Sequence, residues 1–338
     1  MVRSDFIIEV RRYIINPPER RLRAPWRVTV WLFLAGFGLI VLAGLVGLLG
    51  SLAELTGPTF VVGRQITVFA VGTAVAVGIG YLLDRRTLGD YGLDFDRQWW
   101  RDATFGLALG FGLPALVLLT ELAAGMVRVS VGLVTVDSGP LPLTAFGPPV
   151  AVLVLGVFFV VQATAEEVIV RGYLLTNAAE GLAGWVGKRR AVIAATVLTG
   201  ALFGVLHLRN PSASLLSVTN ITLYGLLLGA CYVLTGRLGI ATGFHVAWNY
   251  TLALFGFPVS GIRTGVSILS TDATGPALVT GGGFGPEGGL IALPLLGVGA
   301  AALYWWVRRE YGTVELLDGI ATPDLRIRTP SDIANQDG

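Results

Sequence analysis

The chain contains only two histidines, and each lies in an apolar stretch beside other residues that can do chemistry. Three patterns occur in order along the sequence: Glu166-Glu167-x-x-x-Arg171, Phe203-x-x-x-His207 and His245-x-x-x-Asn249. An ionisable side chain deep in a bilayer costs roughly 3 kcal/mol, so such groups need a reason to be there. Imidazole and carboxylate groups are the usual side chains for moving protons or binding a metal. The patterns therefore indicate a reactive site inside a membrane protein.

The first pattern separates two neighbouring acids into different roles. Glu167 and Arg171 are four residues apart, so on a helix they share one face and can neutralise each other. Glu166 points about 100° away and is left without that partner. We expect Glu167 to be structural and Glu166 to be free for chemistry. The alternative interpretation is a helix end that merely carries interfacial charges.

The two histidine patterns lie on later apolar segments. His245 and Asn249 are four residues apart and share a helical face. A single histidine in a membrane helix more often serves helix packing, through a hydrogen bond, than catalysis. Because both histidines occupy such segments and an unpaired glutamate is present as well, a shared site is favoured. Asn220 and Tyr224 form a further polar face, which we expect to hold helices together.

The amino-acid composition indicates that the segments carrying these residues are membrane-spanning helices. Of 338 residues, 54% are hydrophobic and only 14% are charged, whereas soluble domains carry about 25% charged residues. A soluble enzyme and a nucleic-acid-binding protein are both improbable on that ground. The apolar residues form blocks of about 20, which is the length of a membrane-spanning helix. Eight such spans are expected, at roughly 28–50, 65–83, 103–124, 149–171, 191–208, 215–235, 238–256 and 290–307.

The sequence thus predicts an all-α fold, a polytopic membrane helix bundle of about eight transmembrane helices. Arginines are concentrated in the N-terminal arm, in alternate connections and in the C-terminal tail, which predicts that both termini are cytoplasmic. The predicted organisation is a cytoplasmic arm (1–27), an eight-helix membrane domain (28–307) with a catalytic core (145–256), and a cytoplasmic polar tail (308–338). We expect the tail from Gly312 onwards to be largely disordered.

The depth of the polar groups poses a geometric condition. Counting along the spans places Glu166 nearer the cytoplasmic side and His207 nearer the opposite side. The two can meet if the fourth helix continues to about Ala179, with tilt or an offset fifth helix supplying the rest.

A Gly-rich loop is expected at 257–289. Within it, the segment Gly283-Phe-Gly285-Pro-Glu-Gly288 formally matches a dinucleotide-binding fingerprint. No strand is predicted before it, and a proline occupies the turn that should donate backbone amides. We therefore do not interpret it as a nucleotide site.

Taken together, the three patterns resemble those of the CPBP family, the Abi or CAAX-prenyl-endopeptidase-like group of intramembrane proteases. All seven motif residues agree with the family, and the resemblance covers about 145–256. It implies an endopeptidase that hydrolyses a peptide bond in a membrane-associated protein or peptide. The expected location is the cell membrane, as a multi-pass protein.

By analogy with the family, Glu166 would be the general base that activates water, and His207 would hold or polarise that water. His245 and Asn249 would stabilise the oxyanion of the tetrahedral intermediate. Glu167, Arg171 and Phe203 would support the site. Donors aimed at a developing oxyanion in a dry site are worth about 3–4 kcal/mol each.

The sequence leaves the metal question open. If a metal such as zinc is bound, its ligands would be Glu166, His207 and His245, because two histidines and a glutamate suffice for a catalytic zinc. We favour no metal and no other cofactor, since Asn249 on the face of His245 fits an oxyanion role better than ligation. Expected partners are membrane lipids and a membrane-associated substrate, with no nucleic acid.

Two other functions remain open at this stage. One is a non-catalytic membrane scaffold or bacteriocin-immunity-type protein of the same fold, which would need the helices but not Glu166. The other is a proton-coupled transporter that uses the carboxylate and histidines as a relay. The absence of a Gly/Pro-interrupted helix pair in the sequence makes the transporter the weakest of the three.

Overall fold

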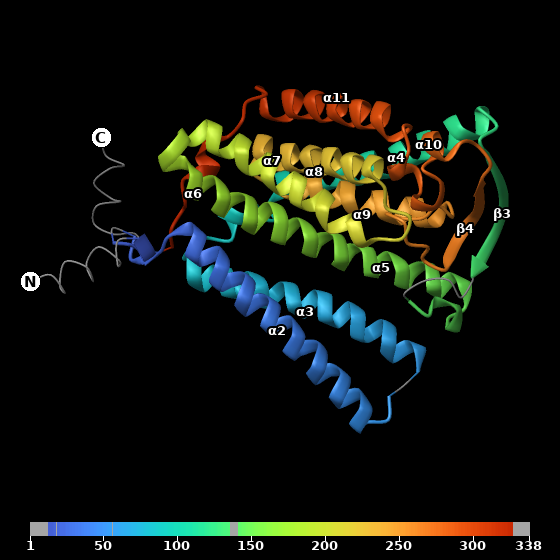
Figure 1. Ribbon diagram of the computed structural model, residues 1–338, viewed down its shortest axis with the longest axis horizontal. Coiled ribbons are helices and arrows are strands. Elements are labelled where there is room, and N and C mark those ends of the chain that lie inside the picture. Colours follow the sequence, from blue (N-terminus) through green and yellow to red (C-terminus); the bar gives the residue numbers. More distant parts are fainter. Residues whose placement is uncertain (1–12, 18, 56, 136–140, 327–338) are drawn as a thin grey trace, which may run out of the picture.

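The computed structural model describes residues 13–17, 19–55, 57–135 and 141–326. Most of this chain is helical, and the long helices lie side by side in one bundle (Figure 1). The long helices are α2 (Ala24–Leu52), α3 (Pro58–Asp84), α4 (Arg97–Ala123), α5 (Pro148–Glu167), α6 (Thr176–Val186), α7 (Lys188–Leu206), α8 (Leu215–Thr235), α9 (Gly239–Leu254) and α11 (Ala292–Tyr311). The polytopic helical bundle expected from the sequence is confirmed.

A helix overlaps each of the eight expected apolar spans, although α3 and α4 begin several residues before theirs. Six of the helical stretches in the described chain are long and apolar enough to cross a membrane by themselves. The helix α9 has only 16 residues and is buried along most of its length, so other helices rather than lipid surround it. The protein is thus a multi-pass membrane protein, and the helix that carries the His245-x-x-x-Asn249 pattern, α9, lies inside the bundle.

The fourth span is longer than hydropathy indicated. The helix α5 passes through a π-helical segment, Val168–Leu175, directly into α6, and the whole stretch Pro148–Val186 is 39 residues long. No proline or glycine interrupts the residues around Glu166, so nothing in the local sequence ends the helix there. Glu166 therefore lies in the middle of a continuous helix, which meets the geometric condition set by the sequence.

Glycines allow α4 and α9 to pack almost backbone to backbone. A methyl group at Gly106 would lie 2.3 Å from the carbonyl oxygen of Ile240, and one at Gly110 would lie 2.4 Å from that of Phe244. Small residues spaced in this way are the usual means of close helix packing in membranes. This contact holds α9, and with it His245, closely against α4.

One end of the bundle is covered by strands and short turns. The antiparallel strands β3 (Val127–Thr135) and β4 (Val266–Ala273) pair beyond the ends of the long helices (Figure 1). After β4, the chain forms α10 (Ala277–Thr280) and two 3-10 turns, Gly282–Phe284 and Pro286–Gly288. The Gly-rich segment is thus a folded cap on the bundle.

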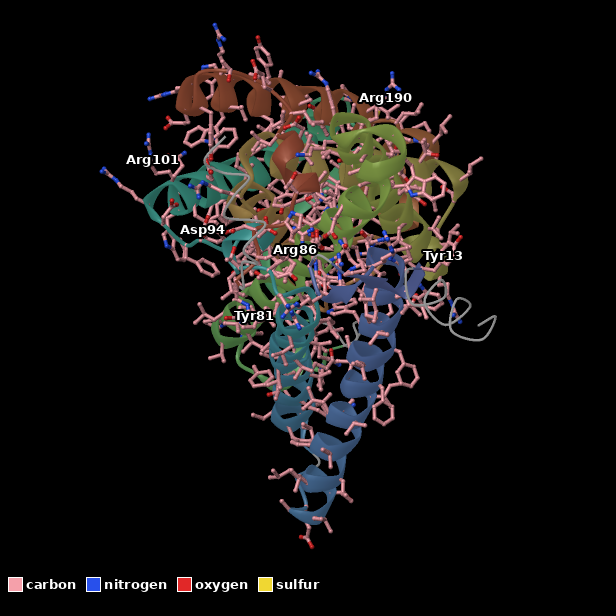
Figure 2. All side chains as sticks on the ribbon, turned by 90° about the vertical axis from the view of Figure 1, so that its left-hand side faces the viewer. Tyr13, Tyr81, Arg86, Asp94, Arg101 and Arg190 are labelled. Carbon is pink, nitrogen blue, oxygen red and sulfur yellow. The ribbon has the colours of Figure 1, made fainter. Side chains whose placement is uncertain are left out.

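At the opposite end, a cluster of buried charges joins α2 and α3 to α6. This is the end near the short strands β1 (Ile15–Asn16) and β2 (Arg21–Leu22), and Figure 2 labels Arg86 there. Arg27 contacts Asp84 at 3.1 Å and Glu180 at 2.7 Å, and Arg86 contacts Glu180 at 2.6 Å. Burial by itself lowers the pKa of Arg86, but Asp90 and Glu180 outweigh burial and raise that pKa, so the guanidinium stays charged.

The tail differs from the sequence expectation as far as Arg326. A 3-10 turn at Asp318–Ala321 packs on α6 and α7, and Ile320 and Ala321 are buried in a cluster with Leu175. The prediction of a largely disordered tail is therefore wrong for this part, because apolar side chains spaced among the polar ones anchor it. Residues 327–338, and residues 1–12 of the predicted arm, lie outside the described chain.

Candidate active site

All four predicted catalytic residues line one cavity of about 440 Å³. Glu166 reaches it from the long α5–α6 helix, His207 from the 3-10 turn after α7, and His245 and Asn249 from α9. The remaining wall is largely apolar, and includes Phe69 of α3. The structure therefore brings together, in one pocket, residues that are up to 83 positions apart in the sequence.

Glu167 lies at the centre of a fully buried hydrogen-bond network. Its Oε1 accepts a bond of 2.8 Å from Nη1 of Arg171 and another of 2.8 Å from Nδ1 of His245. Arg171 also donates to the carbonyl oxygen of Gly225 at 3.1 Å and lies over the ring of Phe203 at 4.5 Å. The pairing of Glu167 with Arg171 agrees with the sequence prediction, and the bond to His245 adds a function that spacing could not reveal. Glu167 fixes the orientation of the imidazole.

Glu166 faces the other side of the same imidazole. Its Oε2 lies 3.8 Å from Nε2 of His245, and its Oε1 accepts a hydrogen bond from Nε2 of Gln162. Its side chain keeps 32% of its surface exposed, whereas that of Glu167 is completely buried. The two adjacent acids therefore differ as the sequence predicts: Glu167 is neutralised in the interior, and Glu166 is open to the cavity.

The π-helix begins immediately after the two acids. A π-helical turn is rare and is found mostly at functional sites, because it shifts the side chains that follow out of ordinary helical register. Here it carries Arg171 and lies between α5 and α6. The local distortion thus falls in the middle of the Glu-Glu-x-x-x-Arg pattern.

His207 is oriented by the residue four positions before it. Its Nδ1 lies 2.7 Å from the carbonyl oxygen of Phe203, and their rings are 4.8 Å apart. Because a carbonyl can only accept, Nδ1 carries the proton and Nε2 keeps its lone pair in the neutral ring. The Phe203 ring also contacts that of His245 edge-on at 5.8 Å, so Phe203 separates and supports both histidines.

Asn249 is connected to Glu166 through Gln162. The Nδ2 atom of Asn249 donates to Oε1 of Gln162 at 3.4 Å, and Gln162 in turn donates to Glu166. The sequence analysis did not identify Gln162. Its signal was present, because Gln162 lies one helical turn before Glu166 and is a polar residue in an apolar segment.

The alternative set of metal ligands does not assemble into a ligand cluster. Within the described ranges, no group of three histidine, cysteine, aspartate or glutamate side chains is arranged to hold a metal ion. His245 and His207 each use Nδ1 for an oxygen acceptor, which leaves Nε2 of each ring as the atom that would bind a metal. Because these three side chains form no such group in the described ranges, the reaction proposed below uses no metal.

Tyr224 and Glu287 also line the cavity, and the sequence analysis gave neither of them a role in the site. Tyr224 lines the cavity beside His245, with ring centroids 5.9 Å apart. Asn220 donates to the carbonyl oxygens of Glu287 and Gly289, so it joins a helix to a loop rather than to another helix. Glu287 itself lines the cavity. Its signal is that it is the only charged residue between Asp272 and Arg308.

Residues 148–251 match a family model described as type II CAAX prenyl endopeptidase Rce1-like. The resemblance to the CAAX-type family is confirmed. The matched segment begins with α5 and ends within α9, so it contains every residue of the three patterns. Comparisons with curated proteins and with solved structures found no match.

The Rce1-like match gives the cavity a chemical context. The family points to a peptidase of the CAAX type, and the described chain supplies membrane helices around a site that contains a carboxylate and two imidazoles. The match ends before the Gly-rich cap, so Glu287 is contributed by a part of the chain outside the family segment.

Proposed function

We propose that this protein is an intramembrane endopeptidase that hydrolyses a peptide bond in a membrane-associated protein or peptide. The observation that supports the proposal most is the convergence of Glu166, His207, His245 and Asn249 on one cavity within a segment that matches the CAAX-type endopeptidases. The apolar walls of the cavity suit a substrate that enters from the bilayer.

In the proposed reaction, Glu166 removes a proton from water as the water oxygen attacks the scissile carbonyl carbon. His207 accepts a hydrogen bond from that water through the lone pair on Nε2. Asn249 donates from Nδ2 to the oxyanion that develops on the carbonyl oxygen. The proton held by Glu166 then passes to the leaving nitrogen as the C–N bond breaks, and the products are a carboxylic acid and an amine, between which the remaining proton redistributes.

His245 completes the proposed oxyanion site. Its Nδ1 donates to Glu167, so its Nε2 can donate to the oxyanion only in the form of the ring in which both nitrogens carry protons. Glu167 and Arg171 hold the ring in place, and neither needs to touch the substrate. No metal or other cofactor is part of this proposal.

Replacing Asn249 with alanine tests the oxyanion assignment. We expect N249A to lower kcat by about 100- to 1000-fold, which is typical of losing one oxyanion donor, with the fold retained. The assay is cleavage of a membrane-anchored peptide by purified protein in lipid vesicles, followed by mass spectrometry. The matched control is Y250F on the same helix, whose hydroxyl donates to the carbonyl oxygen of Val152 and does not line the cavity. Equal activity of N249A and Y250F would contradict the assignment.

A further inference from the structure

Glu287 is a buried carboxylate on the cavity wall that the proposed reaction does not use. It lies in the 3-10 turn Pro286–Gly288 of the Gly-rich cap and is only 5% exposed. Within the described chain, its carboxylate accepts hydrogen bonds from Trp248 and Ser260 alone, and neither donor carries a charge. A buried carboxylate is costly unless hydrogen bonds satisfy its oxygens, and here three donor atoms do so.

One hydrogen bond joins Glu287 to α9, the helix that carries His245 and Asn249. Its Oε1 accepts from Nε1 of Trp248 at 2.8 Å. Trp248 immediately precedes Asn249 and follows His245 by three residues. Because α9 packs closely against Gly110 of α4 at this point, a bond that holds the Trp248 side chain also holds the rotation of the helix face that carries His245 and Asn249.

Other hydrogen bonds connect Glu287, through Ser260 and Asn210, to the turn that carries His207. The Oε2 atom of Glu287 accepts from the backbone nitrogen of Ser260 at 2.5 Å and from its hydroxyl at 3.0 Å. The carbonyl oxygen of Ser260 accepts from Nδ2 of Asn210 at 2.9 Å. Asn210 caps the 3-10 turn of His207, since its backbone nitrogen bonds the carbonyl oxygen of His207 at 3.1 Å. One carboxylate thus connects both histidine-bearing elements.

We infer that Glu287 is a positioning residue for the active site. Its carboxylate sets the distance between the His207 turn and the His245–Asn249 face, and it does so from a loop outside the family segment. The inference rests on the proposed function and adds a residue to it. The carboxylate is required because Trp248 and the Ser260 backbone both present N–H donors, so an amide would place its own NH2 against one of them.

The test compares E287Q with D102N. Asp102 provides a matched buried acid, because it accepts from Nε1 of Trp306 at 2.8 Å and from the Tyr311 hydroxyl, and so joins α4 to α11 away from the cavity. We expect E287Q to lower kcat by about 10- to 100-fold, the usual effect of removing a supporting partner, with KM within about threefold. D102N should lose thermal stability but keep its activity per folded molecule. Equal kcat values for E287Q and D102N would overturn the inference.

A double variant separates positioning from simple destabilisation. In W248F/E287Q the amide can turn its NH2 towards the phenylalanine ring and accept from Ser260 with its oxygen. We expect this protein to be more active than E287Q, whereas a purely structural role predicts additive losses, which would overturn the inference. If E287Q does not fold, S260A removes only the 3.0 Å bond and should give a smaller fall in kcat; an unchanged kcat in S260A would also count against it.

The controls distinguish this inference from the proposed function. If E166Q is inactive while E287Q cleaves like the unmodified protein, Glu287 has no positioning role and the endopeptidase proposal stands. If E166Q cleaves normally, the proposed function fails whatever E287Q does.

Discussion

Replacing Glu166 with glutamine should reduce peptide cleavage by about 100- to 10,000-fold, the range expected for loss of a general base. The glutamine keeps the size of the side chain and can still bond Gln162, so the fold should remain. Glu166 is open to the cavity, and its Oε2 lies 3.8 Å from Nε2 of His245. The measurement is the initial rate of cleavage by purified protein in vesicles, normalised to the folded fraction.

The matched control for this variant is E121Q. Glu121 is likewise a glutamate on a membrane helix, but it is buried, its carboxylate oxygens have no hydrogen-bond partner in the described structure, and it does not line the cavity. We expect E121Q to cleave at the unmodified rate. If E166Q and E121Q lost cleavage activity to a similar extent, the loss would be a general effect of replacing a glutamate in these helices. The assignment of Glu166 as the base would then be contradicted.

Replacing Glu167 with alanine should lower the free energy of unfolding by about 3–5 kcal/mol. The change leaves Arg171 and Nδ1 of His245 buried without their carboxylate acceptor. Thermal or denaturant unfolding in detergent measures the effect. An E167A protein as stable as the unmodified one would contradict the network described here.

The double variant E167L/R171M distinguishes stability from activity at the same pair. Because apolar side chains of similar size can replace a buried ion pair at little cost, we expect most of the stability to return. Activity should remain about 10- to 100-fold low, since His245 still lacks the acceptor that orients it. Full recovery of cleavage would show that Glu167 contributes to folding alone.

Much of the fold follows from the sequence because lipid leaves few options. Apolar blocks of membrane length must be helical, and each of the eight expected spans coincides with a helix. The π-helix at Val168–Leu175 was not predicted, because it changes no residue type and leaves hydropathy unaltered. The packed part of the tail was also missed, since Ile320 and Ala321 are two apolar residues whose burial depends on where α6 and α7 lie.

The site could be predicted in part for a similar reason. Charged and imidazole side chains stand out in apolar segments, so Glu166, His207 and His245 were identifiable by type and spacing. Helical spacing also gave the pairing of Glu167 with Arg171. Spacing could not show that Glu167 bonds His245, 78 residues away, or that Glu287 reaches the same cavity from a loop. Such contacts depend on tertiary packing rather than on local periodicity.

The most direct test of the central claim, that Glu166 activates water in the cavity, is oxygen-isotope transfer in a single turnover. Excess protein and a peptide that it cleaves are mixed in water enriched in oxygen-18, and both are analysed by mass spectrometry. Water activation predicts one heavy oxygen in the new C-terminal carboxylate of the product and none in the protein segment that contains Glu166. Heavy oxygen in that segment, with an unlabelled product, would show instead that the carboxylate attacks the substrate directly, and would contradict the mechanism.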